Sequence, residues 1–346
     1  MKKIAFCGGG SAGHVIPNVA VIESLPPQFD FCYIGTDGIE KTICSKNDIP
    51  FYEFCGVKLA RGKFFCNLLI PIKLLNSVSK CKKLLKEISP SALFCKGGYA
   101  SLPPALAASK LNIPVITHES DISMGLANKI IARRAQLILT SFPQTAKKYS
   151  NAICTGSPMR KNLFGKSAAK EKERLGLDLR PTILVFGGGS GSVAINDALR
   201  KNILSLCKKY NVVHICGKGN SIKSKIYGYI QLEFCDDMGS LYACADYAVA
   251  RCGSNSAFEL IVQKIPTLFI PLDNGATRGD QIENANYFYK KGLCRVLSEK
   301  NLTPKSLQNE INELIADEEL KTALRNDDTQ CGTDNVINAI KSVIKN

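Results

Sequence analysis

Short, nearly continuous apolar runs recur along this chain and alternate with amphipathic segments of helical length. Strands buried on both faces of a sheet have this composition, and strands that alternate with helices form parallel βαβ units. The pattern therefore predicts an α/β protein with parallel sheets. The predicted strands span residues 3–7, 31–34, 92–95, 115–118, 137–140, 182–186, 212–216, 247–250 and 267–270. Clear helical segments lie between them, for example at 15–25, 102–111 and 256–263.

The alternating pattern restarts near residue 180, after a charged segment at 161–180. A chain of 346 residues is also too long for one core of ordinary size. We therefore predict two successive Rossmann-like domains, with their boundary near residues 160–165 and a cleft between them. Ligands of such sheets bind at the carboxyl ends of the strands, so functional residues are expected in the loops that follow strands.

The composition narrows the classes of partner and compartment. The net charge of +15 favours acidic partners, such as nucleic acid, anionic lipid or phosphorylated substrates. Fifteen cysteines are spread along the chain without a C-x-x-C pair, and Cys7, Cys95 and Cys216 lie in apolar runs. We interpret them as buried thiols in a reducing cytosol, and we predict no metal site because no His/Cys cluster has ligand spacing. No run approaches the roughly 20 apolar residues of a membrane helix, so a soluble or peripheral protein is expected.

Three glycine-rich loops follow predicted strands and precede helices, at residues 8–14, 96–101 and 187–192. Glycines let the backbone turn sharply and approach a ligand, while a helix N-terminus offers N–H groups and a positive dipole end. We predict that these loops bind phosphate or other oxyanions. The first loop is not a normal dinucleotide-binding motif with the helix in register, because His14 lies where the helix begins.

Polar residues follow other strands as well. Residues 117–121 place one imidazole and two carboxylates at a strand end, where one of these groups is equally well explained as buried support. Residues 251–259 form a small-residue turn into a helix, which suits a diphosphate. Glu259 lies about one turn inside that helix, where a carboxylate can accept two hydrogen bonds from a ribose diol. His214 lies within an apolar run and is interpreted as a core residue.

These motifs, in this order, resemble those of the bacterial N-acetylglucosaminyltransferases that form lipid II in the second membrane-linked step of peptidoglycan synthesis. The resemblance covers nearly the whole chain. It rests on residues 9–17, 96–99, 118–121, 156–160, 187–191, 251–259 and 278–285. No D-x-D motif, which holds the metal in single-domain nucleotide-sugar transferases, occurs in the chain.

The resemblance implies a GT-B fold, in which two Rossmann-like domains have parallel sheets facing a cleft. The domains would span residues 1–162 and 163–333, with a final helix at about 334–346 packed on the first. The implied reaction is inverting transfer of N-acetylglucosamine (GlcNAc) from UDP-GlcNAc to the C4 hydroxyl of a polyprenyl-diphosphate-linked muramyl-peptide. We expect no cofactor; assistance by a divalent ion stays open, although no binding motif for one occurs in the chain. The implied location is peripheral, on the cytoplasmic face of the cell membrane.

Matching positions suggest roles for individual residues. His14 is the candidate general base and Glu119 the next candidate; Tyr99 and His118 lie on the acceptor side. Cys235 would offer its backbone to the uracil. The suggested UDP-GlcNAc contacts are Ser11, Ala12, Gly13, Asp121, Arg160, Gly189, Ser190, Cys235, Ser254, Asn255, Ser256, Ala257, Phe258, Glu259 and Gln281. Some members have Gln-Asn where this chain has Ser120-Asp121, and the contact in the third loop is assigned only to Gly189 or its neighbour Ser190.

A membrane-docking face is predicted at residues 57–86, which combine aromatic and aliphatic residues with many lysines. Apolar residues can enter the headgroup boundary while basic residues meet anionic lipid. The other interpretation is that the apolar residues belong to a core and the lysines to a solvated face.

Two other functions remain as alternatives. One is a related two-domain enzyme, such as a glycolipid glucosyltransferase or a UDP-GlcNAc epimerase, against which Tyr99 and the His118-Glu119 pair argue. The other is a nucleic-acid-binding protein that uses the net charge of +15, but no helix-turn-helix, RNP-like motif or zinc spacing supports it. We therefore expect no nucleic-acid partner.

Overall fold

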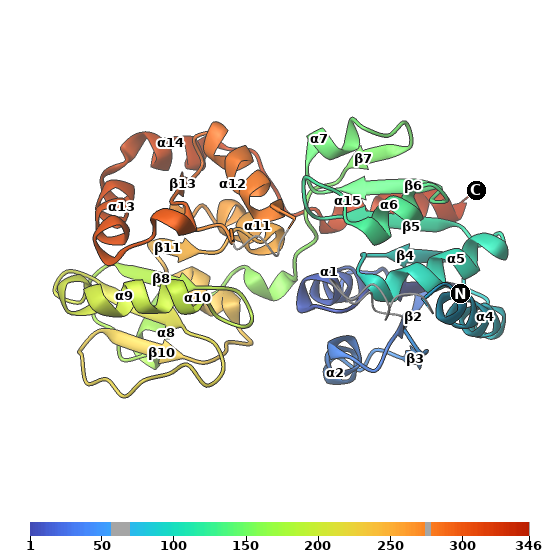
Figure 1. Cartoon of the computed structure of the whole chain (residues 1–346), viewed down its shortest axis with the longest axis horizontal. Helices are drawn as coiled ribbons and strands as arrows, with labels where there is room; N and C mark the ends of the chain where they lie inside the picture. Colours follow the sequence, from blue (N-terminus) through green and yellow to red (C-terminus); the bar gives the residue numbers. More distant parts are fainter. Residues whose placement is uncertain (57–69, 274–277, 346) are drawn as a thin grey trace. The chain divides into compact units, whose positions relative to one another are not determined.

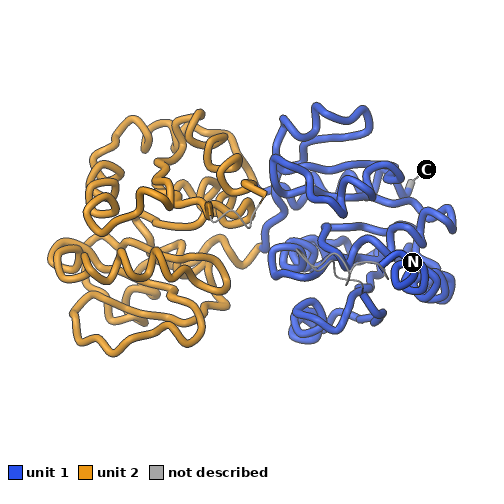
Figure 2. The backbone as a smooth tube through the Cα atoms, in the orientation of Figure 1, with its two compact units in different colours: residues 1–160, 331–346 blue, residues 161–330 orange. Residues whose placement is uncertain are grey.

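The chain forms two compact units, which are coloured separately in Figure 2. The computed structural model describes residues 1–56, 70–273 and 278–345. Unit 1 comprises Met1–Arg160 with Cys331–Asn346, and unit 2 comprises Lys161–Gln330. The boundaries suggested by the sequence, at 162/163 and about 333/334, lie within three residues of these divisions.

Unit 1 is a seven-stranded, fully parallel sheet with strand order β3-β2-β1-β4-β5-β6-β7 (Figure 1). Its strands are β1 (Lys2–Cys7), β2 (Phe29–Gly35), β3 (Phe51–Glu53), β4 (Ala92–Cys95), β5 (Val115–Glu119), β6 (Leu137–Thr140) and β7 (Ala152–Cys154). Its helices are α1 (Ala12–Ile22), α2 (Ile39–Lys46), α4 (Ile70–Ile88), the 3-10 turn η1 (Tyr99–Ser101), α5 (Leu102–Lys110), α6 (Leu126–Ala132), α7 (Pro143–Ala146) and α15 (Thr333–Lys345).

The alternation of side chains along the strands builds a separate core on each face of this sheet. Ile4 and Phe6 of β1 point to one face and pack with α1 and α15, whereas Ala5 and Cys7 point to the other and pack with α4 and α5. The final helix α15 contributes buried apolar residues to the first of these cores. The prediction that the C-terminal helix packs on the first domain is thereby confirmed.

Unit 2 is a six-stranded parallel sheet with strand order β10-β9-β8-β11-β12-β13. Its strands are β8 (Thr182–Phe186), β9 (Asn211–Ile215), β10 (Tyr229–Leu232), β11 (Tyr247–Ala250), β12 (Thr267–Phe269) and β13 (Arg295–Val296). Its helices are η2 (Lys161–Leu163), α8 (Ala168–Arg174), α9 (Val193–Leu206), α10 (Met238–Cys244), α11 (Ser254–Val262), α12 (Asp280–Lys290), η3 (Glu299–Asn301), α13 (Pro304–Ala316) and α14 (Glu318–Asn326).

Every predicted strand is present, and the prediction of parallel sheets in two α/β domains is confirmed. The strands that sequence reasoning missed are β3, β7, β10 and β13, and these are the edge strands of the two sheets. An edge strand is covered incompletely, so its sequence lacks the continuous apolar run that identifies a central strand. The predicted cleft concerns the two units together and stays a prediction.

The interpretation of the cysteines as buried thiols is confirmed only in part: all fourteen described cysteines are free, and Cys7, Cys95 and Cys216 are buried, but Cys55 and Cys154 are exposed. The interpretation of His214 as a core residue is confirmed. His214 is fully buried between Tyr229 Oη and Asn196 Oδ1, both at 2.9 Å, and burial lowers its pKa to about 4. Within the described ranges, no helix is both long enough and apolar enough to cross a membrane.

Candidate functional site

The first two glycine loops lie side by side in unit 1, because β1 and β4 are neighbours and Cys7 pairs with Cys95 in register. The loops touch so closely that a Cβ atom on Gly98 would lie 2.1 Å from the carbonyl oxygen of Gly9. The same Cβ would lie 3.1 Å from Nδ1 of His14. The structure therefore places His14 where the two loops meet.

His14 lies in the first turn of α1 and is half-buried. Its Nδ1 lies 3.0 Å from Oγ of Ser11, and its backbone N–H donates to the Ser11 carbonyl at 3.1 Å. Ser11 and Gly13 are exposed and Ala12 is half-buried, so this predicted group borders solvent at the helix N-terminus. Such a terminus favours a negatively charged ligand.

Tyr99, which was predicted on the acceptor side, packs against the first glycine loop. Its ring occupies the space beside Gly10, where an added Cβ would lie 2.8 Å from Cε1 of Tyr99. Its Oη lies 3.3 Å from Oγ1 of Thr36, a residue that directly follows β2. Tyr99 therefore connects the second loop to both the first loop and the end of β2.

His118 is fully buried at the end of β5. Its Nε2 lies 3.1 Å from the Gly156 carbonyl oxygen, and its Nδ1 lies 2.8 Å from Nζ of Lys96. Burial and the neighbouring Lys96 charge hold the pKa of His118 well below its usual range. The neutral ring thus donates from Nε2 and accepts at Nδ1, so His118 supports the surrounding loops in this conformation.

Lys96 is a buried cation that sequence reasoning did not single out. Its side chain is 1% exposed, and Nζ also donates to Oγ of Ser120. Burial lowers the pKa of Lys96 to about 8, against the opposing effect of the Glu119 and Asp121 charges. The sequence does contain a signal for this residue. Lys96 directly follows a continuous apolar strand, and a charged side chain that is buried at such a position needs polar partners.

Glu119 is buried, and three donors of the following segment occupy its carboxylate. Oε1 accepts from the Asp121 N–H at 3.0 Å, while Oε2 accepts from the Gly125 N–H at 3.0 Å and from Asn128 Nδ2 at 2.9 Å. The carboxylate therefore shapes the loop that carries the half-buried Asp121. This geometry favours support by Glu119 over proton abstraction.

In unit 2, the third glycine loop borders a cavity of about 490 Å³ at the carboxyl end of β8. The cavity is lined by Gly187, Gly191, Ser192, Val193, Ala194, Arg251, Leu272, Gln281 and Glu299. Gly191 has a φ of +74°, and a Cβ atom there would lie 2.2 Å from the Cys216 carbonyl oxygen, so only glycine fits. The predicted contacts Gly189 and Ser190 are exposed and lie in the same loop, outside this lining.

Arg251 and Glu299 form the charged wall of the cavity. Arg251 is buried, forms an ion pair with Glu299, and donates to Ser192 Oγ at 2.8 Å and to the Ile270 carbonyl at 3.0 Å. Glu299 in turn accepts from the Asp273 N–H at 3.0 Å. Sequence reasoning missed Glu299, since it lies 48 residues from its partner and carries no local motif.

The predicted residues of the 251–259 turn begin helix α11, whose N-cap is Gly253. Ser254, Asn255 and Ser256 form its first turn, whereas Ala257 and Phe258 are buried in the core. Glu259 is half-buried, and its Oε2 accepts from Tyr242 Oη at 2.8 Å. The N-terminus of α11 thus follows the carboxyl end of β11, and Glu259 lies farther along the same helix.

The other residues that were predicted to contact UDP-GlcNAc are Gln281, Cys235 and Arg160, and they lie in different segments of the chain. Gln281 lines the cavity, and its Oε1 accepts from the Leu272 N–H at 3.0 Å. Cys235 is half-buried just before α10. Arg160 ends unit 1, and its Nε is buried without a hydrogen-bond partner among the described residues. In the part of the chain that the structure describes, no three His, Cys, Asp or Glu side chains form a group that could hold a metal ion.

Both halves of the chain match models of one glycosyltransferase family, and several relatives match it over nearly its whole length. The glycosyltransferase family 28 N-terminal domain matches residues 4–140, and the C-terminal domain of that family matches residues 182–340. The chain is 41% identical to the UDP-N-acetylglucosamine--N-acetylmuramyl-(pentapeptide) pyrophosphoryl-undecaprenol N-acetylglucosamine transferase of Lachnospira eligens, over 99% of each chain. It is 38% identical to the protein of the same name from Clostridium tetani, over 98% of each chain.

A solved structure shares the fold. The crystal structure of MurG from Acinetobacter baumannii matches with a TM-score of 0.77 and 24% identity. The match covers 99% of this chain and 100% of that chain. The likeness thus extends over both units and their order along the chain.

Proposed function

This chain belongs to the family of UDP-N-acetylglucosamine--N-acetylmuramyl-(pentapeptide) pyrophosphoryl-undecaprenol N-acetylglucosamine transferases, and we propose that it catalyses the reaction which that name describes. GlcNAc moves from UDP-GlcNAc to the C4 hydroxyl of the lipid-linked muramyl-peptide, which converts lipid I to lipid II. The observation that carries this proposal is 41% identity over 99% of the chain. A similarity of this extent favours the transferase over a glycolipid glucosyltransferase, an epimerase or a nucleic-acid-binding protein.

The donor diphosphate is assigned to the carboxyl end of the sheet in unit 2. The cavity there is bordered by the third glycine loop and by the N-terminus of α9, whose N-cap is Ser192. Backbone N–H groups and the positive end of the helix dipole favour the charge that builds up on the departing UDP. Gln281, at the cavity wall, is the candidate contact for the sugar.

The ribose is assigned to Glu259. Its Oε2 is fixed by the Tyr242 hydroxyl at 2.8 Å, which holds the carboxylate in one rotamer. A fixed, half-buried carboxylate can accept hydrogen bonds from two vicinal hydroxyls without first losing rotamer freedom. The uracil is assigned to the backbone at Cys235, on the segment that precedes α10.

His14 is the proposed general base. For this role the ring must donate from Nδ1 to Ser11 Oγ, at 3.0 Å, so that Nε2 keeps the lone pair that accepts the C4 hydroxyl proton. As that proton leaves, the hydroxyl oxygen forms the new bond to C1 of GlcNAc and the bond from C1 to the UDP oxygen breaks. Attack from the face opposite UDP gives the β-linkage.

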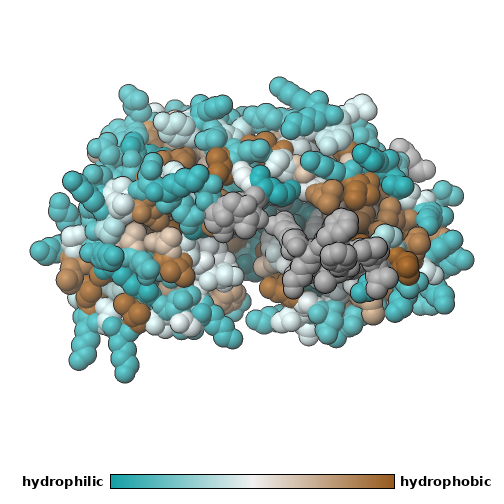
Figure 3. Space-filling model, in the orientation of Figure 1, coloured by the Kyte–Doolittle hydropathy of each residue, from teal (hydrophilic) through white to brown (hydrophobic). Residues whose placement is uncertain are grey.

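Membrane docking is proposed at α4 in unit 1. The part of the predicted 57–86 segment at residues 57–69 lies outside the described residues. Along α4, Ile72 and Leu75 are 59% and 62% exposed. They lie on a helix whose exposed residues also include Lys73, Lys80, Lys83 and Lys86. Figure 3 shows hydrophobic and hydrophilic surface interspersed on the visible face of unit 1. The combination of exposed apolar and basic residues on α4 suits an anionic membrane surface, and it supports a peripheral location on the cytoplasmic face.

The reaction is tested by transfer of labelled GlcNAc from its UDP form to the lipid-linked monosaccharide. We expect label in the lipid product only when both substrates are present, with release of UDP and without conversion of UDP-GlcNAc to an epimer. Transfer should persist in EDTA, since we propose that no metal or other cofactor takes part. Epimer formation without acceptor, or transfer to another glycolipid only, would refute the proposal.

Docking is tested separately with vesicles that contain phosphatidylglycerol. Replacing Ile72 and Leu75 by Ser and Lys80 and Lys83 by Glu should reduce binding and slow transfer to the lipid acceptor, but spare a short-chain soluble acceptor. A matched control changes the exposed Leu179 to Ser and the exposed Lys208 and Lys209 to Glu in unit 2. Equal binding by both variants would place the docking surface elsewhere.

A further inference from the structure

A fully buried carboxylate lies beneath the first glycine loop, at a position without an assigned role. Glu40 is in the first turn of α2 and is 0% exposed. An isolated buried charge is costly unless it is hydrogen-bonded or paired with a cation. Within residues 1–56, 70–273 and 278–345, no lysine or arginine forms an ion pair with Glu40. Hydrogen bonds from neutral donors must therefore stabilise it.

Those donors belong to the first glycine loop and to the end of β2. Oε2 accepts from the N–H of Gly10 at 3.3 Å. Oε1 accepts from the N–H of Thr36 at 3.2 Å and from its hydroxyl at 2.5 Å. Gly10 has a φ of +85°, so the carboxylate holds the loop at a residue with a left-handed backbone.

Glu40 occupies space that side chains at three neighbouring glycine positions would otherwise fill. A Cβ atom on Gly9 would lie 2.5 Å from Oε1, and one on Gly38 would lie 2.9 Å from Oε2. A Cβ atom on Gly35 would lie 2.9 Å from Cγ of Glu40. At least one glycine of the first loop is thus required by the carboxylate beneath it, in addition to any approach of a ligand from above.

The contacts continue from Glu40 to the second loop and to His14. The Thr36 hydroxyl, which donates to Glu40, lies 3.3 Å from Tyr99 Oη, and the Tyr99 ring packs on Gly10. Beside Tyr99, Gly98 lies against the Gly9 carbonyl and His14 Nδ1. A shift of Gly10 would therefore displace the Tyr99 ring and change the contact between His14 and the second loop.

We propose that Glu40 is a positioning residue for sugar transfer, whose buried carboxylate fixes the first glycine loop and, through Thr36 and Tyr99, the second loop around His14. It acts through the loops and does not touch the reacting atoms. This inference rests on the proposed function, in which His14 accepts the proton of the acceptor hydroxyl.

The first test measures the loop itself and needs no activity. Glu40→Gln retains the size of the side chain but has one acceptor oxygen, so at least one of the Gly10 and Thr36 bonds is lost. We expect faster amide hydrogen exchange in residues 8–13 of the folded Glu40→Gln variant, with unchanged exchange in unit 2. The matched control is Glu53→Gln, the same change at an exposed carboxylate of unit 1. Unchanged exchange at Gly10 in Glu40→Gln would overturn the proposal.

The second test measures transfer. Loss of a charge-assisted hydrogen bond should lower kcat of Glu40→Gln by about tenfold to a hundredfold. KM for UDP-GlcNAc should change by a smaller factor, because the cavity assigned to the donor diphosphate lies in unit 2 and only the predicted contacts at Ser11–Gly13 belong to this loop. In the His14→Ala background the same change should have almost no further effect on kcat, since both act on one step. A full-sized effect in that background, or a rise in KM alone, would overturn the proposal.

A milder variant covers the case in which Glu40→Gln does not fold. Thr36→Val removes the hydroxyl that lies between Glu40 and Tyr99 but keeps the shape and the backbone bond. It should raise exchange at the loop and lower kcat in the same direction, by a smaller factor. Wild-type values for both would overturn the proposal. If wild-type protein transfers no GlcNAc, the proposed function fails, whereas the exchange experiment still decides whether Glu40 holds the loop.

Discussion

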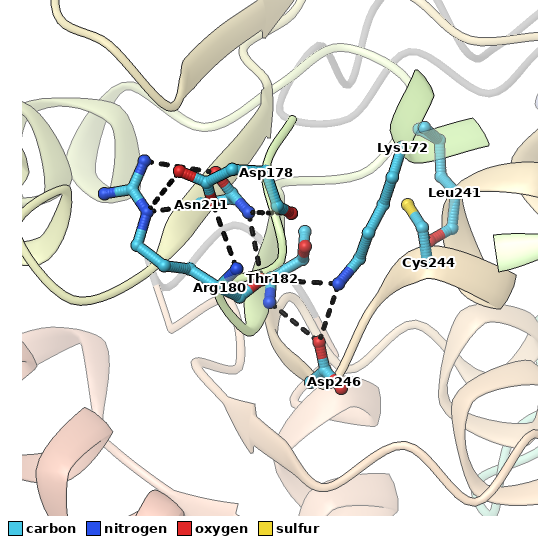
Figure 4. A network of polar contacts seen from close by, with 8 residues as sticks. All are labelled: Lys172, Asp178, Arg180, Thr182, Asn211, Leu241, Cys244 and Asp246. Atoms are coloured by element: carbon cyan, nitrogen blue, oxygen red, sulfur yellow. Dashed lines mark hydrogen bonds and ion pairs between the residues drawn. The ribbon is translucent and has the colours of Figure 1, made fainter. Parts of the chain in front are cut away.

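The two ends of the sheet in unit 2 use polar residues in opposite ways. At the amino end, Thr182 begins β8 and its N–H donates to Asp246 at 2.8 Å, while Lys172 Nζ lies 3.7 Å from the same carboxylate (Figure 4). At the carboxyl end, Ser192 and Arg251 also bond to each other, but they surround a cavity of about 490 Å³. The first arrangement joins chain segments, and the second leaves room for a ligand.

The amino end continues as a closed network around Asn211, which is fully buried. Its Nδ2 donates to the carbonyls of Asp178 and Arg180, at 3.2 and 2.9 Å (Figure 4). The Arg180 guanidinium binds the Asp178 carboxylate at 2.8 Å and lies 5.2 Å from the Tyr227 ring centre. Polar groups at this end should therefore govern stability, whereas those at the carboxyl ends should govern binding and rate.

The largest effect is expected from a carboxyl-end change in unit 1. His14→Ala should lower kcat by about 10²–10⁴-fold, the usual contribution of general acid–base catalysis, without a comparable loss of stability. Steady-state transfer and chemical denaturation measure the two quantities. If the folded variant keeps nearly normal turnover, His14 is not the base, and Glu119 becomes the next candidate despite its three hydrogen bonds.

Glu259→Ala is the corresponding carboxyl-end change in unit 2. A hydrogen bond to a charged group contributes roughly 1.5–3 kcal/mol, so the Kd of UDP should rise about tenfold to a hundredfold. Tyr242→Phe should weaken UDP binding less, and it should have no effect in the Glu259→Ala background, because it acts through Glu259. Calorimetric titration gives these values. An unchanged Kd in Glu259→Ala would remove this residue from the nucleotide site.

Asn211→Ala tests the amino end and should give the opposite result. Among the described residues, it removes the only side-chain donor of the part-buried Asp178 carbonyl oxygen and one of the two side-chain donors of the Arg180 carbonyl oxygen, which keeps Lys172 Nζ at 3.3 Å. This loss should lower the free energy of unfolding by about 1–3 kcal/mol. Folded protein should still bind UDP with the wild-type Kd. Denaturant unfolding and calorimetry provide the two numbers. Weaker UDP binding with unchanged stability would contradict the division between the two ends.

The smallest effect concerns pH. The side-chain hydrogen bond from Arg180 lowers the pKa of Asp178 to about 2, below its ordinary value of 3.8. A carboxylate with a lowered pKa in the folded state adds stability above its unfolded pKa, and that stability is lost as the pH falls. Wild-type unfolding midpoints should therefore decline between about pH 4 and pH 2. The decline should be shallower in Asp178→Asn than in the wild-type protein, and equal slopes in the two proteins would refute the assignment.

The central strands and the glycine loops could be predicted because their signals are local. A run such as Ala92–Cys95 is apolar throughout since both faces are covered, and the loop that follows begins at the next residues. The edge strands lacked this signal: Ala152–Cys154 has two exposed residues out of three. Partial cover removes the constraint on composition, so sequence alone does not identify such strands.

Contacts across long stretches of sequence limited the prediction of the site. The pairs Arg251–Glu299 and Lys96–His118, and the bond from Gly10 to Glu40, join residues 22 to 48 positions apart. Each depends on which strands become neighbours, and spacing along the chain does not give that order. Residues of the glycine loops were found, whereas the distant carboxylates Glu40 and Glu299, which bind the first loop and Arg251, were not.

Analysis of the transfer product tests the proposed reaction most directly. The disaccharide released from the lipid product should show, by NMR, GlcNAc joined to C4 of the muramic acid residue with the large coupling of a β-anomeric proton. Its formation should depend on His14 and on UDP-GlcNAc, and should survive Asn211→Ala in proportion to the folded fraction. An α-linkage, a bond to a different hydroxyl, or a product that contains an epimer of GlcNAc would contradict inverting transfer by this chain.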